Sequence, residues 1–397
     1  MKNLYQFVSA HILSSTGDWF RSILLITTLI RLNSNPAMIS FYFVMGILPS
    51  IILTPIASPL SKKFKKKQII LFGDMIKVVT SMFLIPIVYW ESIIGIIIIV
   101  FINGGVNAIS APSKSILIPL MVSKEDLVKA NSLMAATQSI VMLLSTALGG
   151  VANTFLNAFT ILSISIACLF IAIILISFIN VNEVLEVSTD KVSHWRNMAN
   201  SFTVLKTNSA LKSAVSFSVC REFIGGFIYV FFSYQILQLL DLGSMGLSYG
   251  YIATGIGQIL GSYCINKFSN NLKKQQVIYT VILASISAFL FFHSLSYLIS
   301  HAILFFILNF IASLFYNPIS VVVNVLIANS TEEKNHGNAF FINHFYTMLA
   351  YLLGFVAVGV LSLVFVHDTV LYMMIFSSII LLVLTQYMAR RKVKVFD

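Results

Sequence analysis

Apolar stretches that are long enough to cross a bilayer follow one another along almost the whole chain. A helix needs about 20 predominantly apolar residues to span the hydrocarbon core, and stretches of about 18 already qualify. The twelve stretches that we identify are approximately 5–30, 38–60, 68–90, 93–113, 127–150, 155–181, 211–237, 244–266, 276–297, 300–328, 338–366 and 368–389. The eleventh is overlong, and we expect it to be tilted or interrupted near Gly354 and Gly359. The sequence therefore predicts an all-α membrane protein with twelve transmembrane helices.

The net charge of +11 takes its meaning from where the charges lie. Only 10% of the residues are charged, against about 25% in soluble domains, so a soluble globular protein is excluded. All Lys and Arg residues except Arg21, Arg31, Lys77 and Arg221 fall in loops or termini on one predicted side, which is the positive-inside pattern. The loop 61–67, with five lysines, fixes that side as cytoplasmic. We therefore expect both termini in the cytoplasm, membrane lipid as a partner, and no nucleic acid.

One long polar segment, 182–210, interrupts the series of apolar stretches and reads as a cytoplasmic linker. It separates residues 1–181 from residues 211–397, and six predicted spans lie on each side. The two halves also share features at a nearly constant offset, because Asn103 precedes Pro112 by nine residues, as Asn309 precedes Pro318. Many transporters consist of two related halves. We therefore predict two pseudo-symmetric six-helix bundles.

Charged residues occur in the middle of the first stretch of each half. Asp18 and Arg21 are three residues apart, so they lie on one helix face and can neutralise each other. An ionised group at this depth costs about 3 kcal/mol and is by default a functional candidate. The repeat places Asp18 opposite Arg221 and Glu222. Adjacent helical residues diverge by about 100°, so we expect only one of these two to face a cavity.

Several motifs resemble those of the major facilitator superfamily, in particular its drug:proton antiporter branch, which includes macrolide-efflux and siderophore-exporting proteins. The motifs are Gly17-Asp18-Trp19, the loop 61–67, Gly73-Asp74, Ala111-Pro112 with Pro119-Leu120, Leu127 through Asn131, and Gln138-Ser139. The loop is similar to the signature GxxxDRxxRR, with Ser58 in place of its glycine, Lys62 in place of its aspartate and Lys63 at its first arginine. The resemblance implies two bundles that alternate access to a central cavity.

The resemblance also implies where the functional side chains lie. The candidate proton-coupling residues are Asp18, Glu222, Arg21 and Arg221. The candidate cavity residues are Trp19, Phe20, Asn103, Asn107, Gln138, Phe227, Tyr229, Asn309, Tyr316 and His344. The candidate gate residues are Lys62, Lys63 and Asp74. Desolvation disfavours the charged form of a carboxylate, which would let Asp18 or Glu222 bind a proton on one side and release it on the other.

Structural roles compete with these functional ones. Asp18 and Arg21 would also suit a static buried pair, and the two asparagines Asn103 and Asn309 would suit hydrogen bonds between helices. The aromatic residues and His344 would suit lipid contact or packing. Asp74 and Lys77 look like a pair at the cytoplasmic interface, with a gate latch as the alternative.

Enzyme and cofactor signatures are missing from the sequence. It has no GxxxxGK[ST], HExxH or nucleophile-elbow motif, and its three cysteines lack metal-ligand spacing. We therefore expect no enzyme activity, no metal site and no cofactor, with the proton gradient as the energy source.

The leading hypothesis is an exporter in the bacterial inner membrane. It would act as a monomer and move an amphipathic small molecule outward, either a drug such as a macrolide or a metal-chelating metabolite, in exchange for protons. The alternatives are a non-transporting membrane sensor or partner protein with the same fold, and a nutrient uniporter or importer.

Overall fold

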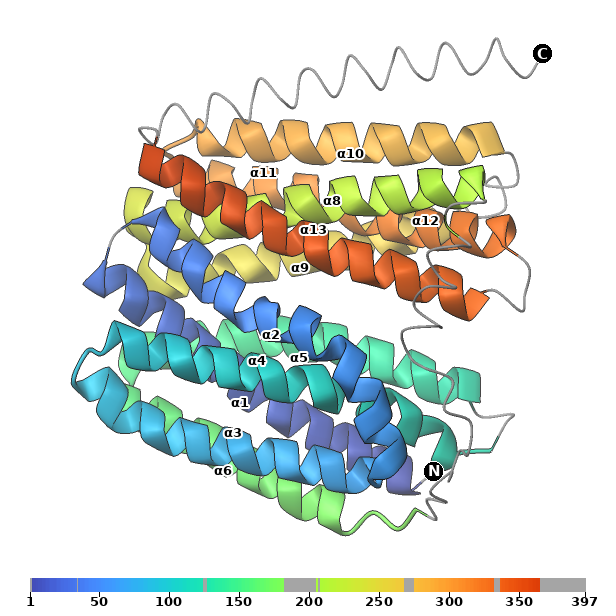
Figure 1. Ribbon diagram of the computed structural model, residues 1–397. Coiled ribbons are helices and arrows are strands. Elements are labelled where there is room, and N and C mark those ends of the chain that lie inside the picture. Colours follow the sequence, from blue (N-terminus) through green and yellow to red (C-terminus); the bar gives the residue numbers. More distant parts are fainter. Residues whose placement is uncertain are drawn as a thin grey trace. The chain divides into compact units, whose positions relative to one another are not determined.

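The computed structural model describes residues 2–33, 35–123, 127–181, 205, 208–267, 275–331 and 336–364. Within these ranges the chain is helical with short connections, and no β-strand occurs (Figure 1). The twelfth predicted span, the C-terminal tail and most of the predicted linker lie outside them. The all-helical class is thus confirmed, whereas the count of twelve spans stays a prediction.

The helices follow the predicted stretches closely. In the first half they are α1 (Lys2–Leu32), α2 (Pro36–Lys63), α3 (Lys66–Tyr89), α4 (Ile93–Leu117), the 3-10 turn η1 (Ile118–Leu120), α5 (Leu127–Phe155) and α6 (Ala158–Ser177). The second half contains α8 (Ser209–Tyr234), the π-helical turn η2 (Gln235–Leu239), α9 (Gly243–Lys267), α10 (Gln275–Tyr297), α11 (Ala302–Leu314), α12 (Tyr316–Ser330) and α13 (His336–Val364). Eight helical segments of the described part are long and apolar enough to cross a membrane.

Two helices differ from expectation. The predicted stretch 300–328 is broken at Phe315 into α11 and α12, and Pro318 lies in the first turn of α12, where a proline needs no backbone donor. By contrast, α13 continues through Gly354 and Gly359, so of the two expected alternatives the interruption is excluded and the tilt stays a prediction. Gly354 serves helix packing, because a Cβ there would lie 2.3 Å from the carbonyl oxygen of Phe223 on α8.

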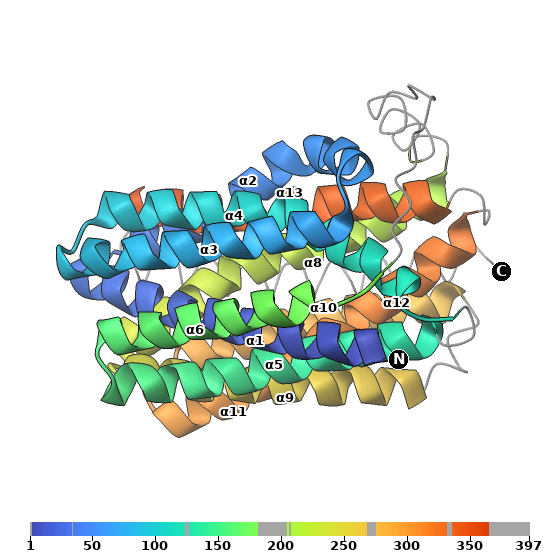
Figure 2. The same cartoon turned by 90° about the horizontal axis from the view of Figure 1, so that it is seen from below.

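The chain divides into two compact units, one of residues 1–34, 41–195 and 243–248 and the other of residues 35–40, 196–242 and 249–397. In the first unit α1 packs against α5 and α6, and α3 packs against α4 and α6, as Figures 1 and 2 show. In the second unit α8 packs against α12 and α13, and α10 packs against α11 and α12.

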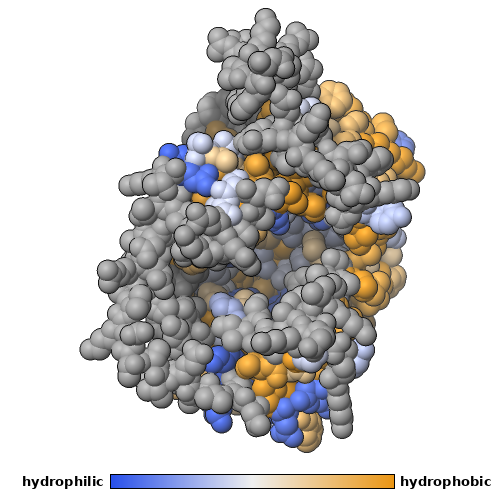
Figure 3. Space-filling view, turned by 90° about the vertical axis from the view of Figure 1, so that its right-hand side faces the viewer, coloured by the Kyte–Doolittle hydropathy of each residue, from blue (hydrophilic) through white to orange (hydrophobic). Residues whose placement is uncertain are grey.

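Apolar side chains occupy both the interior of each unit and much of its outside. One core cluster joins four helices of the first unit through Phe7, Ile70, Leu117 and Ile176. Large apolar side chains such as Phe83 are nevertheless exposed, and orange apolar residues make up much of the described surface in Figure 3. Such a surface suits contact with lipid tails.

Candidate functional site

Asp18 lies at the centre of a buried charge cluster in the first unit. Its Oδ1 accepts a hydrogen bond from Nη2 of Arg21 at 2.5 Å, and its Oδ2 accepts one from Nζ of Lys77 at 2.6 Å. The side chains of Arg21 and Lys77 are 6% and 2% exposed, whereas that of Asp18 is 27% exposed. Each carboxylate oxygen therefore has its own cation.

Hydrogen bonds extend this cluster across α1, α3 and α4. Nη1 of Arg21 donates to Oγ of Ser81 at 2.7 Å, and that hydroxyl donates to the carbonyl oxygen of Lys77 at 2.7 Å. Oγ1 of Thr80 donates to Oδ1 of Asn103 on α4 at 3.0 Å. The polar groups thus connect three helices, and Asn103 takes part in this connection.

Asp74 and Lys77 do not form the expected pair at the interface. Both residues are buried, because they lie well inside α3, which already begins at Lys66. Lys77 pairs with Asp18, and Oδ1 of Asp74 accepts from Oγ of Ser14 at 3.4 Å. Among the described residues Oδ2 of Asp74 has no hydrogen-bond partner. The side chains of the other two gate residues, Lys62 and Lys63, lie outside the described part, so a gate role stays a prediction.

Sequence reasoning missed three members of the cluster. Lys77 comes from 59 residues away, Ser81 follows it by one helical turn, and Lys114 on α4 is a third cation in electrostatic range of Asp18 and Asp74. The spacing of Asp74, Lys77 and Ser81 is i, i+3 and i+7, which is one stripe of a helix. Such a polar stripe on an otherwise apolar helix is the sequence signal from which the contact between α3 and Asp18 could have been predicted.

Glu222 forms a second, smaller charge cluster in the other unit. It pairs with the neighbouring Arg221, and its Oε2 accepts a hydrogen bond from Oη of Tyr316 at 3.3 Å. The guanidinium carbon of Arg221 lies 4.5 Å from the ring centroid of Tyr316, within the range of a cation–π contact. The expectation that only one of these two residues faces a cavity is therefore wrong, because both contact Tyr316 and both line the same cavity. Adjacent residues of a helix point about 100° apart, but these two side chains are long enough to reach each other.

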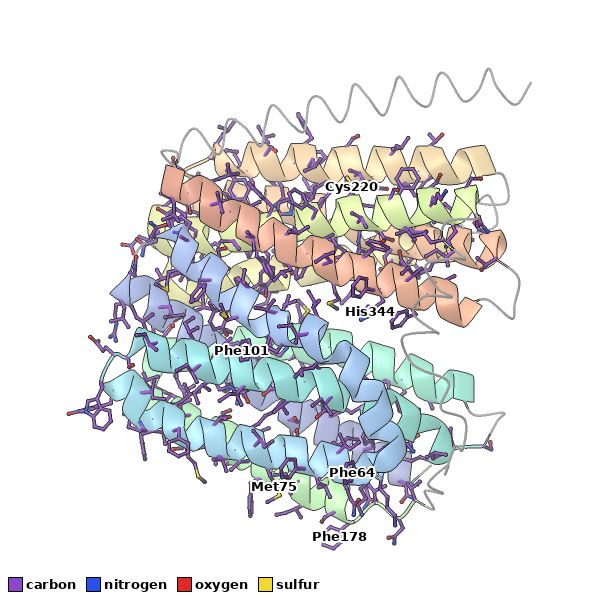
Figure 4. The ribbon with its side chains drawn as sticks, in the orientation of Figure 1. Phe64, Met75, Phe101, Phe178, Cys220 and His344 are labelled. Atoms are coloured by element: carbon purple, nitrogen blue, oxygen red, sulfur yellow. The ribbon has the colours of Figure 1, made fainter. Side chains whose placement is uncertain are left out.

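Both residues line a cavity of about 470 Å³ between α8, α12 and α13. Its polar wall includes Ser218, Ser320, Asn324, Asn343, His344, Thr347 and Tyr351. Its apolar wall consists of Ile319, Val323, Phe340 and Met348. His344, labelled in Figure 4, extends from α13. The volume is in the range of small-molecule sites.

The remaining cavity candidates lie elsewhere in the described part. Asn309 is fully buried, and its Nδ2 donates to the carbonyl oxygen of Phe305 in its own helix at 2.8 Å. Phe227 stacks on Phe231 with ring centroids 5.3 Å apart, and Tyr229 lies 5.9 Å from the ring of Tyr251. The described lining of the Glu222 cavity includes none of these three predicted residues.

In the first unit, Phe20 is buried, Trp19 is partly buried and Asn107 is exposed. The side chain of Gln138 lies outside the described part. A search of the described residues for three or more His, Cys, Asp or Glu side chains in metal-binding arrangement finds none.

Comparison with known proteins gives one family and several structural relatives. A sequence model of the Major Facilitator Superfamily matches residues 7–307. No curated protein matches the sequence. Among solved structures, the nucleoside transporter NupG is 12% identical with a TM-score of 0.78, and the alignment covers 98% of this chain and 99% of that one.

Two further solved structures resemble the chain over nearly its full length. The POT family transporter PepTSo is 10% identical with a TM-score of 0.74, covering 100% of this chain and 99% of that one. A bacterial homologue of the iron transporter ferroportin in an inward-facing state is 12% identical with a TM-score of 0.72, covering 98% of each chain. At these identities the likeness shows the fold alone.

Proposed function

This chain belongs to the major facilitator superfamily and is a multi-pass membrane transporter rather than an enzyme, and we propose that it exports an amphipathic small molecule in exchange for protons. The proposal includes the drug:proton antiporter branch, the bacterial inner membrane and cytoplasmic termini. Its substrate would be a drug or a metal-chelating metabolite with a cationic centre. The observation that carries it is the position of Glu222 at the wall of a cavity whose lining is part polar and part apolar.

Glu222 has the surroundings that proton exchange requires. A proton or a cationic substrate centre would each neutralise the carboxylate, so the two would compete for it, which is the requirement for antiport. Either event releases Arg221 from its ion pair. The guanidinium of Arg221 then retains its cation–π contact with the ring of Tyr316, and such a contact contributes about 0.5–2 kcal/mol of stabilisation. The contact with the ring therefore offsets part of the cost of opening the pair.

Asp18 has a different environment, which supports a structural role. Two cations at 2.5 and 2.6 Å stabilise its ionised form, and a proton would have to displace both contacts. Removal of one partner from a buried ion pair is costly. We therefore assign coupling to Glu222 and assign helix attachment to Asp18, which revises the equal roles that the internal repeat suggested.

Transport in inverted vesicles tests the proposal. With a panel of fluorescent amphipathic cations, the parent should accumulate a dye when a pH gradient is imposed, and Glu222→Gln should lose this dependence. The matched control is Glu91→Gln, which removes an exposed carboxylate that pairs with Arg31 at the surface and should transport like the parent.

Three outcomes would contradict antiport at this site. Accumulation that survives collapse of the pH gradient would show that transport is not coupled to protons. Unchanged transport by Glu222→Gln would show that Glu222 is not the coupling residue. Failure of the whole panel to move would favour a sensor with a transporter fold.

A second candidate is import of an anionic solute, and the position of Arg221 on the same cavity favours it. Protonation of Glu222 would free the guanidinium for a carboxylate or phosphate of the solute, so proton and anion would bind together and move in the same direction. The direction of net flux under an imposed gradient separates this candidate from export.

A further inference from the structure

An apolar groove runs along the outside of the first unit between α2, α3 and α4. Its volume is about 750 Å³, and in its described lining only Gln68 and Ser110 have polar side chains. Phe64 and Phe101, both labelled in Figure 4, belong to its wall. A groove with so few polar groups offers few hydrogen bonds, so its chemistry suits a hydrocarbon chain.

Close contact between helices forms the floor of this groove. Gly73 on α3 lines it, and a Cβ at this position would lie 2.4 Å from Oγ of Ser110 on α4. Gly105 on α4 also lines it, and a Cβ there would lie 3.2 Å from Cδ1 of Leu53 on α2. The helices therefore touch at the floor, while larger side chains form the walls.

The length of the groove matches one leaflet of a bilayer. Its wall on α3 extends from Gln68 to Ile76, and its wall on α4 extends from Phe101 to Ser110. At about 1.5 Å per residue these segments are about 12 and 14 Å long. Half of a hydrocarbon core of about 30 Å is about 15 Å, so one acyl chain would fill the groove within a single leaflet.

Basic residues occur at one end of the groove. Its lining residue Phe64 is followed directly by Lys65, Lys66 and Lys67, and the segment 58–73 contains five lysines and no acidic residue. The side chain of Lys65 is exposed. Lys67 instead donates to the carbonyl oxygens of Ser177 and Ile179 at 2.7 and 2.8 Å. Among the described lysines at this end, Lys65 is the exposed one.

We propose that this groove is a binding site for an anionic phospholipid, whose acyl chain lies between α2, α3 and α4 and whose phosphate binds Lys65. The headgroup of the occupant is anionic because the apolar groove ends next to the exposed Lys65, and basic residues next to a membrane attract anionic lipids. The site is independent of the Glu222 cavity, which lies in the other unit. Lipid binding is thus separable from transport.

The test uses the purified full-length protein in detergent with phosphatidylglycerol or phosphatidylcholine of identical acyl chains. Native mass spectrometry counts retained lipids, and thermal unfolding measures the shift in Tm. We expect phosphatidylglycerol to be retained and to raise Tm more than phosphatidylcholine. Lys65→Gln should weaken the phosphatidylglycerol affinity about fivefold, the effect of one basic residue at an anionic surface.

A pair of substitutions on α4 locates the acyl chain. Ile102→Trp fills the groove from a position that is 39% exposed, and Ile98→Trp adds the same side chain one turn away, outside the groove, at a position that is 53% exposed. Ile102→Trp should retain one phosphatidylglycerol fewer, and Ile98→Trp should retain as many as the parent.

Two results would overturn the proposal. Equal retention of the two lipids by the parent would show that the site does not prefer an anionic headgroup. Equal loss of lipid in both tryptophan variants would show that the acyl chain does not lie in the groove. Because both positions are partly exposed, folding of the variants is expected. If Ile102→Trp fails to fold, Phe72→Ala in the groove and Phe83→Ala outside it, both exposed on α3, give the same comparison.

Discussion

Replacing Lys77 by methionine should destabilise the first unit far more than the loss of a surface ion pair. Methionine keeps the volume of the lysine stem but leaves Oδ2 of Asp18 without its cation. Removing one partner of a buried ion pair costs about 3–5 kcal/mol. Asp18 retains Arg21 and is 27% exposed, so we take the lower end, about 3 kcal/mol.

The assay is thermal unfolding of the purified full-length protein, followed by tryptophan fluorescence at one fixed scan rate, because membrane proteins of this size often unfold irreversibly. A change of 1 kcal/mol shifts Tm by about 2–4 °C for a unit of 150–250 residues, so Lys77→Met should lower Tm by about 6–12 °C. The control is Arg31→Gln, which removes an exposed pair at 2.9 Å and should cost under about 1 kcal/mol.

A double variant refines this prediction. Asp18→Asn combined with Lys77→Met removes the charge that Lys77→Met leaves with one cation instead of two, so the double loss should be smaller than the sum of the single losses by about 1–3 kcal/mol. Strict additivity, or a Lys77→Met shift no larger than that of Arg31→Gln, would refute the argument that Lys77 compensates Asp18 in the interior.

Two further predictions concern helix contact and the cavity. Gly104→Ala should destabilise the protein by about 1–3 kcal/mol, because its Cβ would lie 2.3 Å from the carbonyl oxygen of Gly46. The control is Gly46→Ala, whose Cβ would have its nearest neighbour at 3.6 Å, so this variant should unfold at the parental Tm or above it. Equal effects would show that α2 moves freely against α4. Tyr316→Phe keeps the ring under Arg221 but removes the donor to Glu222, so gradient-driven transport should slow, and Tyr316→Leu, which removes both, should lose more. Identical rates for the two variants would argue against a role for the ring.

The fold was largely predictable because the bilayer allows few solutions. Backbone groups must be satisfied internally at membrane depth, so apolar stretches of the right length become helices, as α3, α4 and α6 do. The break at Phe315 was harder to predict, because Pro318 allows either a kink or a fresh helix start. The continuity of α13 depends on packing against α8, and a sequence pattern does not reveal such a contact.

The charge clusters were only half predictable for a related reason. Local spacing placed Arg21 beside Asp18, because three residues along a helix fix that geometry. The pairing with Lys77 depends on how α1 and α3 are rotated toward each other, which involves many contacts far apart in sequence. The contact of Arg221 with Glu222 was missed because the prediction considered the directions of Cα positions and not the reach of the side chains.

The internal repeat aligned two carboxylates, yet their surroundings give them different capacities to change partners. Asp18 is held by a cation from its own helix and by another from α3, so releasing it disturbs a contact between helices. The ion pair of Glu222 is with its neighbour on the same helix, so it can open without separating two charged residues of different helices, and Tyr316 on α12 contacts both members of the pair. A coupling residue has to exchange partners in every cycle, and the exchange is less costly where no ion pair between helices breaks. The sequence symmetry of the halves therefore does not extend to the surroundings of the two carboxylates, and this difference is why we propose Glu222, and not Asp18, as the coupling residue.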